Sequence, residues 1–192
     1  MKKLLGIALV AMLATVSQAA SITWGSNGTT SRFLLDAAGG TGSANRLPKE
    51  SIICLIYLGT GTSVTFDNKQ ESYSAETIGD AISGGTVYTT GALTAGGTYS
   101  KTFGGTEWTT DRLNGNYAIL YFNATSWEDI KKGTEFGITT DVTSVSLAAE
   151  NDQTGKASLK NNVGLTGTIV PEPSTAALAL AGLALLLKRR RA

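Results

Sequence analysis

The sequence predicts an all-β domain, an antiparallel β-sandwich or jelly-roll-like fold, over residues 20–169 of the 192-residue chain. Two observations support this fold class. The chain has 23 glycines against 3 prolines, and no helical period persists for a dozen residues within this range. Short runs of β-branched and aromatic residues recur instead, at the length of strands. The range of about 150 residues is long enough for one domain with its own core.

Two of these runs are strongly apolar. Residues 51–58 are apolar at every position after Ser51, which predicts a strand covered on both faces near the middle of a sheet. Residues 117–123 form the second run. Cys54 is the only cysteine, its neighbours are apolar, and the chain has no histidine to activate a thiol. We therefore expect Cys54 to be a small buried hydrophobic residue.

Weaker patterns predict the remaining strands. Strands are expected at residues 21–24, 32–36, 63–67, 136–147 and 162–169, the fourth as two short strands or one with a bend. Paired glycines followed by threonine stand at 84–86, 96–98 and 104–106, each before an aromatic residue that alternates with polar residues. Because paired glycines make tight turns at positive φ, this repeat predicts a β-meander.

The connections between the strands carry weak helical signals. Residues 71–83 and 125–132 are each expected to contain a short helical turn. In the second, Ser126 precedes Asp129 by three residues in a loose capping arrangement. Residues 150–167 are polar and predict a turn between late strands.

The first 19 residues have the features of a cleavable signal peptide. Lys2 and Lys3 precede an apolar stretch, and Ser17 and Ala19 place small residues at the −3 and −1 positions of a signal peptidase site. We expect cleavage between Ala19 and Ala20. The partners in this step would be the Sec machinery and signal peptidase.

The last 23 residues, 170–192, combine three blocks. These are Pro171, Glu172 and Pro173, then an uncharged apolar run over 174–187, then the cations Lys188, Arg189, Arg190 and Arg191. As a helix, the run would be about 21 Å long, shorter than the hydrocarbon core of about 30 Å. The cations nevertheless favour a transmembrane helix, since long basic side chains snorkel to the interface. They orient its basic end toward the cytoplasm.

This arrangement resembles the PEP-CTERM sorting tail. The resemblance implies processing in or near Pro171–Pro173 by exosortase, a membrane-embedded cysteine transpeptidase-like enzyme of Gram-negative bacteria. It further implies an inner-membrane-anchored precursor with its passenger domain on the periplasmic side, and a final place at the cell surface or in the extracellular matrix, often associated with exopolysaccharide. The resemblance covers the tail alone, so the passenger must be interpreted separately.

The charge of the passenger excludes nucleic acid as a partner. Six of the 16 basic side chains lie in the two terminal segments, as does one of the 15 acidic ones. The passenger therefore carries 10 basic and 14 acidic side chains, a net charge of −4. Non-specific binding to nucleic acid depends on neutralising phosphates with a basic surface, which this domain lacks.

The passenger sequence contains few residues or motifs that are typical of catalysis or cofactor binding. The absence of histidine excludes Ser-His and Cys-His nucleophiles, and the glycine-rich turns lack a phosphate-binding motif. We expect neither enzymatic activity nor a cofactor. A structural calcium ion held by loop oxygens is an alternative, with Asp67-Asn68, Glu128-Asp129 and Asn151-Asp152 as candidate ligands.

Tryptophan residues separate two functional hypotheses. Trp24 is expected in the core, whereas Trp108 lies among threonine and glutamate residues and is the candidate sugar contact, with Trp127 as a further aromatic platform. The first hypothesis is a non-enzymatic structural protein of the envelope or matrix. The alternative is a lectin-like carbohydrate-binding β-sandwich.

Overall fold

The computed structural model describes residues 21–26, 31–103, 115–143 and 154–172. The predicted signal peptide with its cleavage site at Ala19 and Ala20, and the predicted transmembrane helix with its basic end, lie outside these residues. No helix within the described ranges is long and apolar enough to cross a membrane.

The described residues form an all-β fold in three sheets. The strands are β1 (Ser21–Gly25), β2 (Ile52–Gly59), β3 (Thr65–Phe66), β4 (Ile82–Ser83), β5 (Thr86–Ala92), β6 (Ser100–Phe103), β7 (Asn116–Phe122), β8 (Glu135–Thr139), β9 (Thr154–Ser158) and β10 (Gly167–Thr168). Short 3-10 helices lie at η1 (Ala37–Gly39), η2 (Ser43–Asn45), η3 (Ile78–Ala81) and η4 (Trp127–Asp129).

The largest sheet has the strand order β10-β8-β7-β2-β5, with every neighbouring pair antiparallel. Strands β2 and β7 lie inside it and are its two continuously apolar strands, as the sequence predicted. Successive side chains of a strand point to opposite faces. The buried side chains of β2 and β7 accordingly alternate between two cores, one on each face of this sheet.

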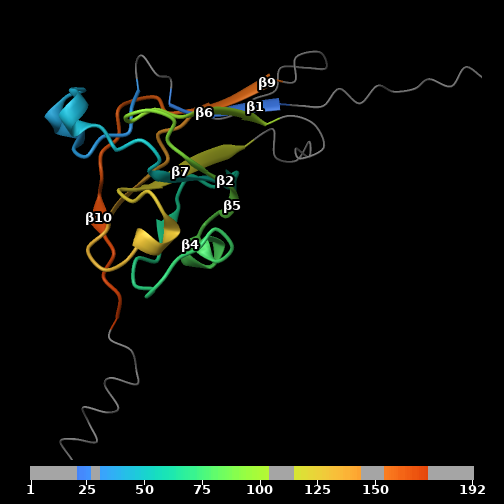
Figure 1. The fold of residues 1–192 in the computed structure, drawn as a ribbon. Helices are drawn as coiled ribbons and strands as arrows, with labels where there is room; N and C mark the ends of the chain where they lie inside the picture. The colour runs from blue at the N-terminus through green and yellow to red at the C-terminus, as the bar shows by residue number, and fades with distance from the viewer. Residues whose placement is uncertain (1–20, 27–30, 104–114, 144–153, 173–192) are drawn as a thin grey trace, which may run out of the picture.

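The first core, which we call the sandwich core, lies between this sheet and the sheet β6-β1-β9. It contains Ile53 and Leu55 of β2, Tyr121 of β7, and Trp24 and Ala157 of the smaller sheet. Figure 1 shows β6, β1 and β9 as a layer on one side of β7 and β2. The predicted sandwich is present in this pair of layers.

The second core, the outer core, covers the opposite face of the large sheet. Cys54 and Ile56 of β2 and Phe122 of β7 pack there with Ile78 of η3 and Ile82 of β4. The hairpin of β3 and β4 lies on this side, where Figure 1 places β4 away from the β1 layer. Coverage of β2 on both faces is therefore confirmed.

The small sheet departs from the predicted antiparallel arrangement. Strand β1 pairs antiparallel with β6 but parallel with β9, from Ser21 opposite Thr154 to Gly25 opposite Ser158. A parallel pair needs a long connection, and here almost the whole domain separates the two strands. Strand β9 also corrects the prediction that residues 150–167 form a turn, although 150–153 lie outside the described residues.

The predicted β-meander is wrong. Strand β5 pairs with β2 in the large sheet, whereas β6 pairs with β1 in the small one. The glycines do form turns, with φ of 89° at Gly84 and 71° at Gly97. The chain nevertheless crosses between layers because Tyr99, after the second turn, packs against Trp24 in the sandwich core. The third repeat, 104–106, lies outside the described residues.

The weaker predictions have mixed outcomes. Residues 32–36 are not a strand but make isolated bridges at Phe33 and Leu34, both fully buried. Strands β1, β3, β8 and β10 confirm four of the short strands, and Val142 after β8 forms a bridge with Leu159. Helices η3 and η4 confirm both helical turns, and the Ser126 hydroxyl donates to Asp129 Oδ2 at 2.8 Å.

Candidate functional site

The chain leaves the domain core at Ile169, directly after β10. Ile169 is 1% exposed and belongs to the outer core, whereas Val170 is 54% exposed. The Ile169 N–H donates to Thr134 O at 2.9 Å, and the Gly133 N–H donates to Ile169 O at 3.0 Å. Within the described residues, Ile169 is therefore the last one whose side chain is buried in the core.

A loop at residues 67–70 lies beside this exit and is fixed by Tyr73. The Tyr73 hydroxyl donates to Asp67 O at 2.7 Å and accepts from the Gln70 N–H at 3.1 Å. The Lys69 N–H donates to Asp67 Oδ1 at 3.0 Å. Tyr73 is 4% exposed and packs in the outer core, and burial raises its pKa. The 67–70 loop is thus held to the core by one buried side chain.

The first residues of the tail are bonded to the 67–70 loop. The Val170 N–H donates to Asn68 O at 2.9 Å, and the Glu172 N–H donates to Lys69 O at 3.1 Å. The Asn68 side-chain amide donates to Thr168 O at 2.7 Å. The ammonium of Lys69 lies 2.7 Å from Glu172 Oε1. We call residues 167–172 together with the 67–70 loop the tail junction.

Electrostatics favour the same contact. The hydrogen bond and charge of Glu172 raise the pKa of Lys69. Both side chains are largely exposed, 60% for Lys69 and 67% for Glu172. Exposed ion pairs of this kind contribute little to global stability, so the pair orients the junction more than it stabilises the fold.

The candidate calcium ligands Asp67 and Asn68 have protein partners in this junction. Asp67 Oδ1 accepts from the Lys69 N–H, and the Asn68 side chain donates to Thr168 O. Asp129 of the second candidate pair accepts from Ser126. The third pair, Asn151-Asp152, lies outside the described residues. Within the described ranges, no three His, Cys, Asp or Glu side chains are grouped to hold a metal ion.

A groove of about 530 Å³ lies beside the 67–70 loop, between residues 71–77 and the segment from η4 to Lys131. Its lining includes half-buried Trp127, whose ring meets Phe122 edge-on at 6.3 Å. Glu71, Glu76 and Glu128 also line it. A hydrogen bond from the Ser74 hydroxyl to Glu76 Oε2, at 2.7 Å, lowers the pKa of Glu76. The groove thus combines an aromatic ring with carboxylates and hydroxyls.

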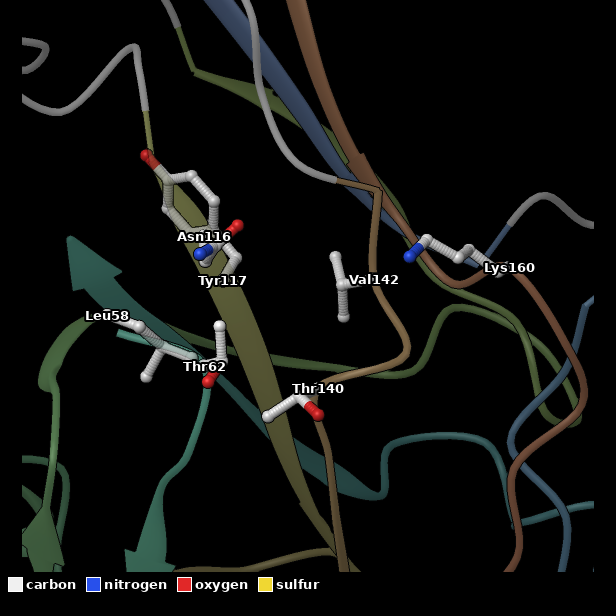
Figure 2. Close-up of a pocket in the computed structure, with 7 residues that line it drawn as sticks. All are labelled: Leu58, Thr62, Asn116, Tyr117, Thr140, Val142 and Lys160. Atoms are coloured by element: carbon white, nitrogen blue, oxygen red, sulfur yellow. The ribbon is translucent and has the colours of Figure 1, made fainter. Parts of the chain in front are cut away.

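A smaller pocket of about 210 Å³ lies at one end of the sandwich. It is lined by Leu58, Thr62, Asn116, Tyr117, Thr140, Val142 and Lys160. Figure 2 shows the Lys160 side chain reaching toward Val142 from the side opposite Leu58 and Thr62. The lining contains no carboxylate, so it offers no acid–base pair of the glycosidase type.

The structure places two of the residues singled out in the sequence inside the domain. Trp24 is fully buried, with its ring centroid 4.5 Å from that of Tyr99, which confirms its core role. Cys54 is fully buried, and desolvation raises the pKa of its thiol, which confirms it as a buried hydrophobic residue. Trp108, the candidate sugar contact, lies outside the described residues, as do Pro173 and the basic end from Lys188 to Arg191.

These features define an all-β passenger domain that is followed, without a linker, by a C-terminal sorting tail. Residues 170–192 match the family model of the PEP-CTERM protein-sorting motif. This match confirms the resemblance of the tail, and the motif implies an exported protein that is targeted to exosortase from a membrane-anchored precursor in a Gram-negative bacterium. Comparison with curated proteins and with solved structures finds no match for the chain.

Proposed function

We propose that the protein is a non-enzymatic structural component of the cell envelope or extracellular matrix, associated with exopolysaccharide. The observation that carries this proposal is the direct connection of a two-core β-domain to a PEP-CTERM tail, with Ile169 buried and Glu172 already in the motif. The domain's Trp24 and Cys54 side chains are used for packing. In this proposal the passenger acts through its surface and through the place to which it is delivered.

In this proposal, the two terminal segments act in sequence. The Sec machinery exports the chain, signal peptidase cuts between Ala19 and Ala20, and the helix over 174–187 holds the precursor in the inner membrane. The cations 188–191 stay cytoplasmic, so the passenger faces the periplasm. Exosortase then acts in or near residues 171–173 and releases or transfers the passenger to the cell surface or matrix.

Intact-mass measurement of the mature protein tests this pathway. The wild-type protein should begin at Ala20 and should lack the region beyond the Pro-Glu-Pro motif. The tail should be retained when Pro171 and Pro173 are replaced by alanine, and also in a strain without exosortase. Retention of Lys188–Arg191 in the mature wild-type protein would contradict the proposal.

The groove beside Trp127 favours a second candidate function, carbohydrate binding. A half-buried aromatic ring with carboxylates and hydroxyls around it matches the general composition of ligand pockets, an apolar lining with a few polar groups. Calorimetric titration with the exopolysaccharide of the producing strain tests this. Binding that is lost in Trp127→Ala or Trp108→Ala would support a lectin-like module. No binding, or binding unchanged in both variants, would leave the structural function.

A further inference from the structure

The sorting motif begins on the surface of the folded domain, and two of its residues make three contacts there. Val170 and Glu172 donate their amides to the 67–70 loop, and the Glu172 carboxylate pairs with Lys69. Figure 1 shows the end of the described chain leaving past β10, on the opposite side of the large sheet from β1. The junction is therefore the place where domain and tail meet.

We propose that the 67–70 loop is a binding site for the sorting motif, which holds Val170–Glu172 against the passenger until this segment releases for processing. The attachment itself follows from the contacts at the junction. Its consequence for exosortase rests on the proposed function.

The backbone pattern suits a sequence with proline at position 171. The two amides that bond to the loop belong to Val170 and Glu172, on either side of Pro171. Proline has no N–H and is tolerated in an extended segment only where that donor is not needed. Two main-chain hydrogen bonds, from amides two residues apart, thus attach the motif to the loop and leave position 171 free of any need for a donor. The side chain of Asn68 fixes the start of this segment through Thr168 O.

The charge pattern gives the contact its specificity. Glu172 is the only charged residue between Gly167 and Ser174, and Lys69 lies 2.7 Å from its carboxylate. Any enzyme that recognises the motif by this carboxylate must compete with Lys69. Lys69 therefore pairs with the one charge of the Pro-Glu-Pro segment, although the Glu172 side chain stays 67% exposed.

The attachment shortens the chain segment between the folded domain and the apolar run, and so limits the access of a processing enzyme to the motif. From Glu172 to the start of the apolar run at Ser174 there is one intervening residue, which spans about 7 Å when fully extended. If residues 170–172 release and Ile169 stays in the core, the tether from Ile169 to Ser174 can reach about 17 Å. Release of the junction therefore more than doubles the maximum length of the tether between the folded domain and the predicted transmembrane helix.

Amide hydrogen exchange on the full-length precursor, purified in detergent, tests the attachment. Because Pro171 has no amide, residues 170–172 report only through Val170 and Glu172, which mass spectrometry with fragment resolution separates. Both amides should be protected in the wild type. In Lys69→Glu, Glu172 exchange should become faster, by up to about fivefold, and the swap Lys69→Glu/Glu172→Lys should restore protection.

The matched control is Lys49→Glu, which reverses a second exposed lysine–glutamate pair of the described residues, Lys49–Glu50 at 3.5 Å. Its Glu172 exchange should equal that of the wild type. The attachment is overturned if wild-type Glu172 exchanges like an unstructured peptide, or if Lys69→Glu has no larger effect than Lys49→Glu.

Processing rates test the consequence of the attachment. In a strain that produces exosortase, pulse–chase should show faster tail removal for Lys69→Glu than for the wild type, with Lys49→Glu at the wild-type rate. Equal rates in all three would overturn the restraint on processing. Absence of tail removal in every variant would instead count against the proposed exosortase step, while the exchange measurements still decide the attachment.

Discussion

The Tyr121 hydroxyl donates a 2.6 Å hydrogen bond to the carbonyl oxygen of Gly164, 43 residues along the chain. Tyr121 lies in β7 at the centre of the large sheet, and Gly164 follows the bridge between Phe33 and Val163. The Tyr121 ring also packs against Phe33 at 5.0 Å. This contact ties the late part of the chain to the middle of the sheet.

Replacing Tyr121 by phenylalanine should lower the free energy of unfolding by about 1–2 kcal/mol, because Gly164 O loses its hydroxyl partner in a buried site. Tyr99→Phe is the matched control. Tyr99 is also buried, but within the described structure its hydroxyl has no hydrogen-bond partner. Its removal should leave stability unchanged or raise it. Urea denaturation measures both, and equal losses would contradict the assignment.

Gly137 faces the same tyrosine from β8. A Cβ at this position would collide with the Tyr121 ring, so Gly137→Ala should cost about 1–3 kcal/mol through overpacking. Gly79→Ala is the control, since a Cβ at Gly79 meets nothing within 4 Å. Denaturation midpoints should separate the two substitutions clearly, and a neutral Gly137→Ala would show that β8 shifts freely.

Alkaline pH should destabilise the domain through its buried tyrosines. Burial raises the pKa of Tyr99 to about 12 and raises that of Tyr121 further. Above about pH 10, the unfolded chain releases these protons while the folded chain keeps them, so stability falls by about 1.4 kcal/mol per pH unit for each group. For Tyr99 this loss runs from about pH 10 to about 12.

Urea denaturation between neutral and strongly alkaline pH measures this dependence. The double variant Tyr99→Phe/Tyr121→Phe should show a shallower decline with pH than the wild type. If the free energy of unfolding falls identically with pH in the two proteins, groups other than Tyr99 and Tyr121 cause the alkaline transition.

The sequence predicted the central strands because their signal is local. A run such as 51–58 is apolar at successive positions, and only a strand covered on both faces buries all of them. The burial of Cys54 followed from its apolar neighbours in the same way, whereas that of Trp24 followed from the general tendency of large aromatic residues to fill the core. These predictions needed no knowledge of the strand order.

The parallel pairing of β1 with β9, and the tail junction, could not be predicted in this way. Ser21 pairs with Thr154, and Lys69 pairs with Glu172 across 103 residues. Single exposed charges at such separations carry no periodic signal. The β-meander predicted from the glycine repeat is wrong for a related reason. Similar turns precede Val87 and Tyr99, but the two residues pack in different cores.

Cys54 should be inert toward thiol reagents while the domain is folded. Its side chain is fully buried, and desolvation raises the pKa of the thiol, so little thiolate is present at neutral pH. Labelling should appear only with denaturant, following the global unfolding curve. Cys54→Ser should lower the free energy of unfolding by about 1–3 kcal/mol because it places a hydroxyl in the outer core. Cys54→Ala places no polar group there and should cost less than Cys54→Ser. Rapid native labelling would contradict this burial.

Ile169 determines how firmly the tail junction is attached to the core. Its side chain is 1% exposed in the outer core, and its backbone bonds to Gly133 and Thr134 on the far side from the 67–70 loop. Ile169→Ala should therefore lower the free energy of unfolding by about 2–4 kcal/mol. Val170→Ala is the neighbouring control and should change stability by less than about 0.5 kcal/mol, since Val170 is 54% exposed.

Hydrogen exchange distinguishes the local from the global effect of this anchor. Loss of the Ile169 side chain should accelerate exchange at Val170 and Glu172 more than at Leu120 in the central strand, because the junction opens without unfolding the large sheet. Equal acceleration at all three amides would mean that the junction opens only with the whole domain. In that case the core would govern the release of the motif, and Lys69 would have no separate effect on it.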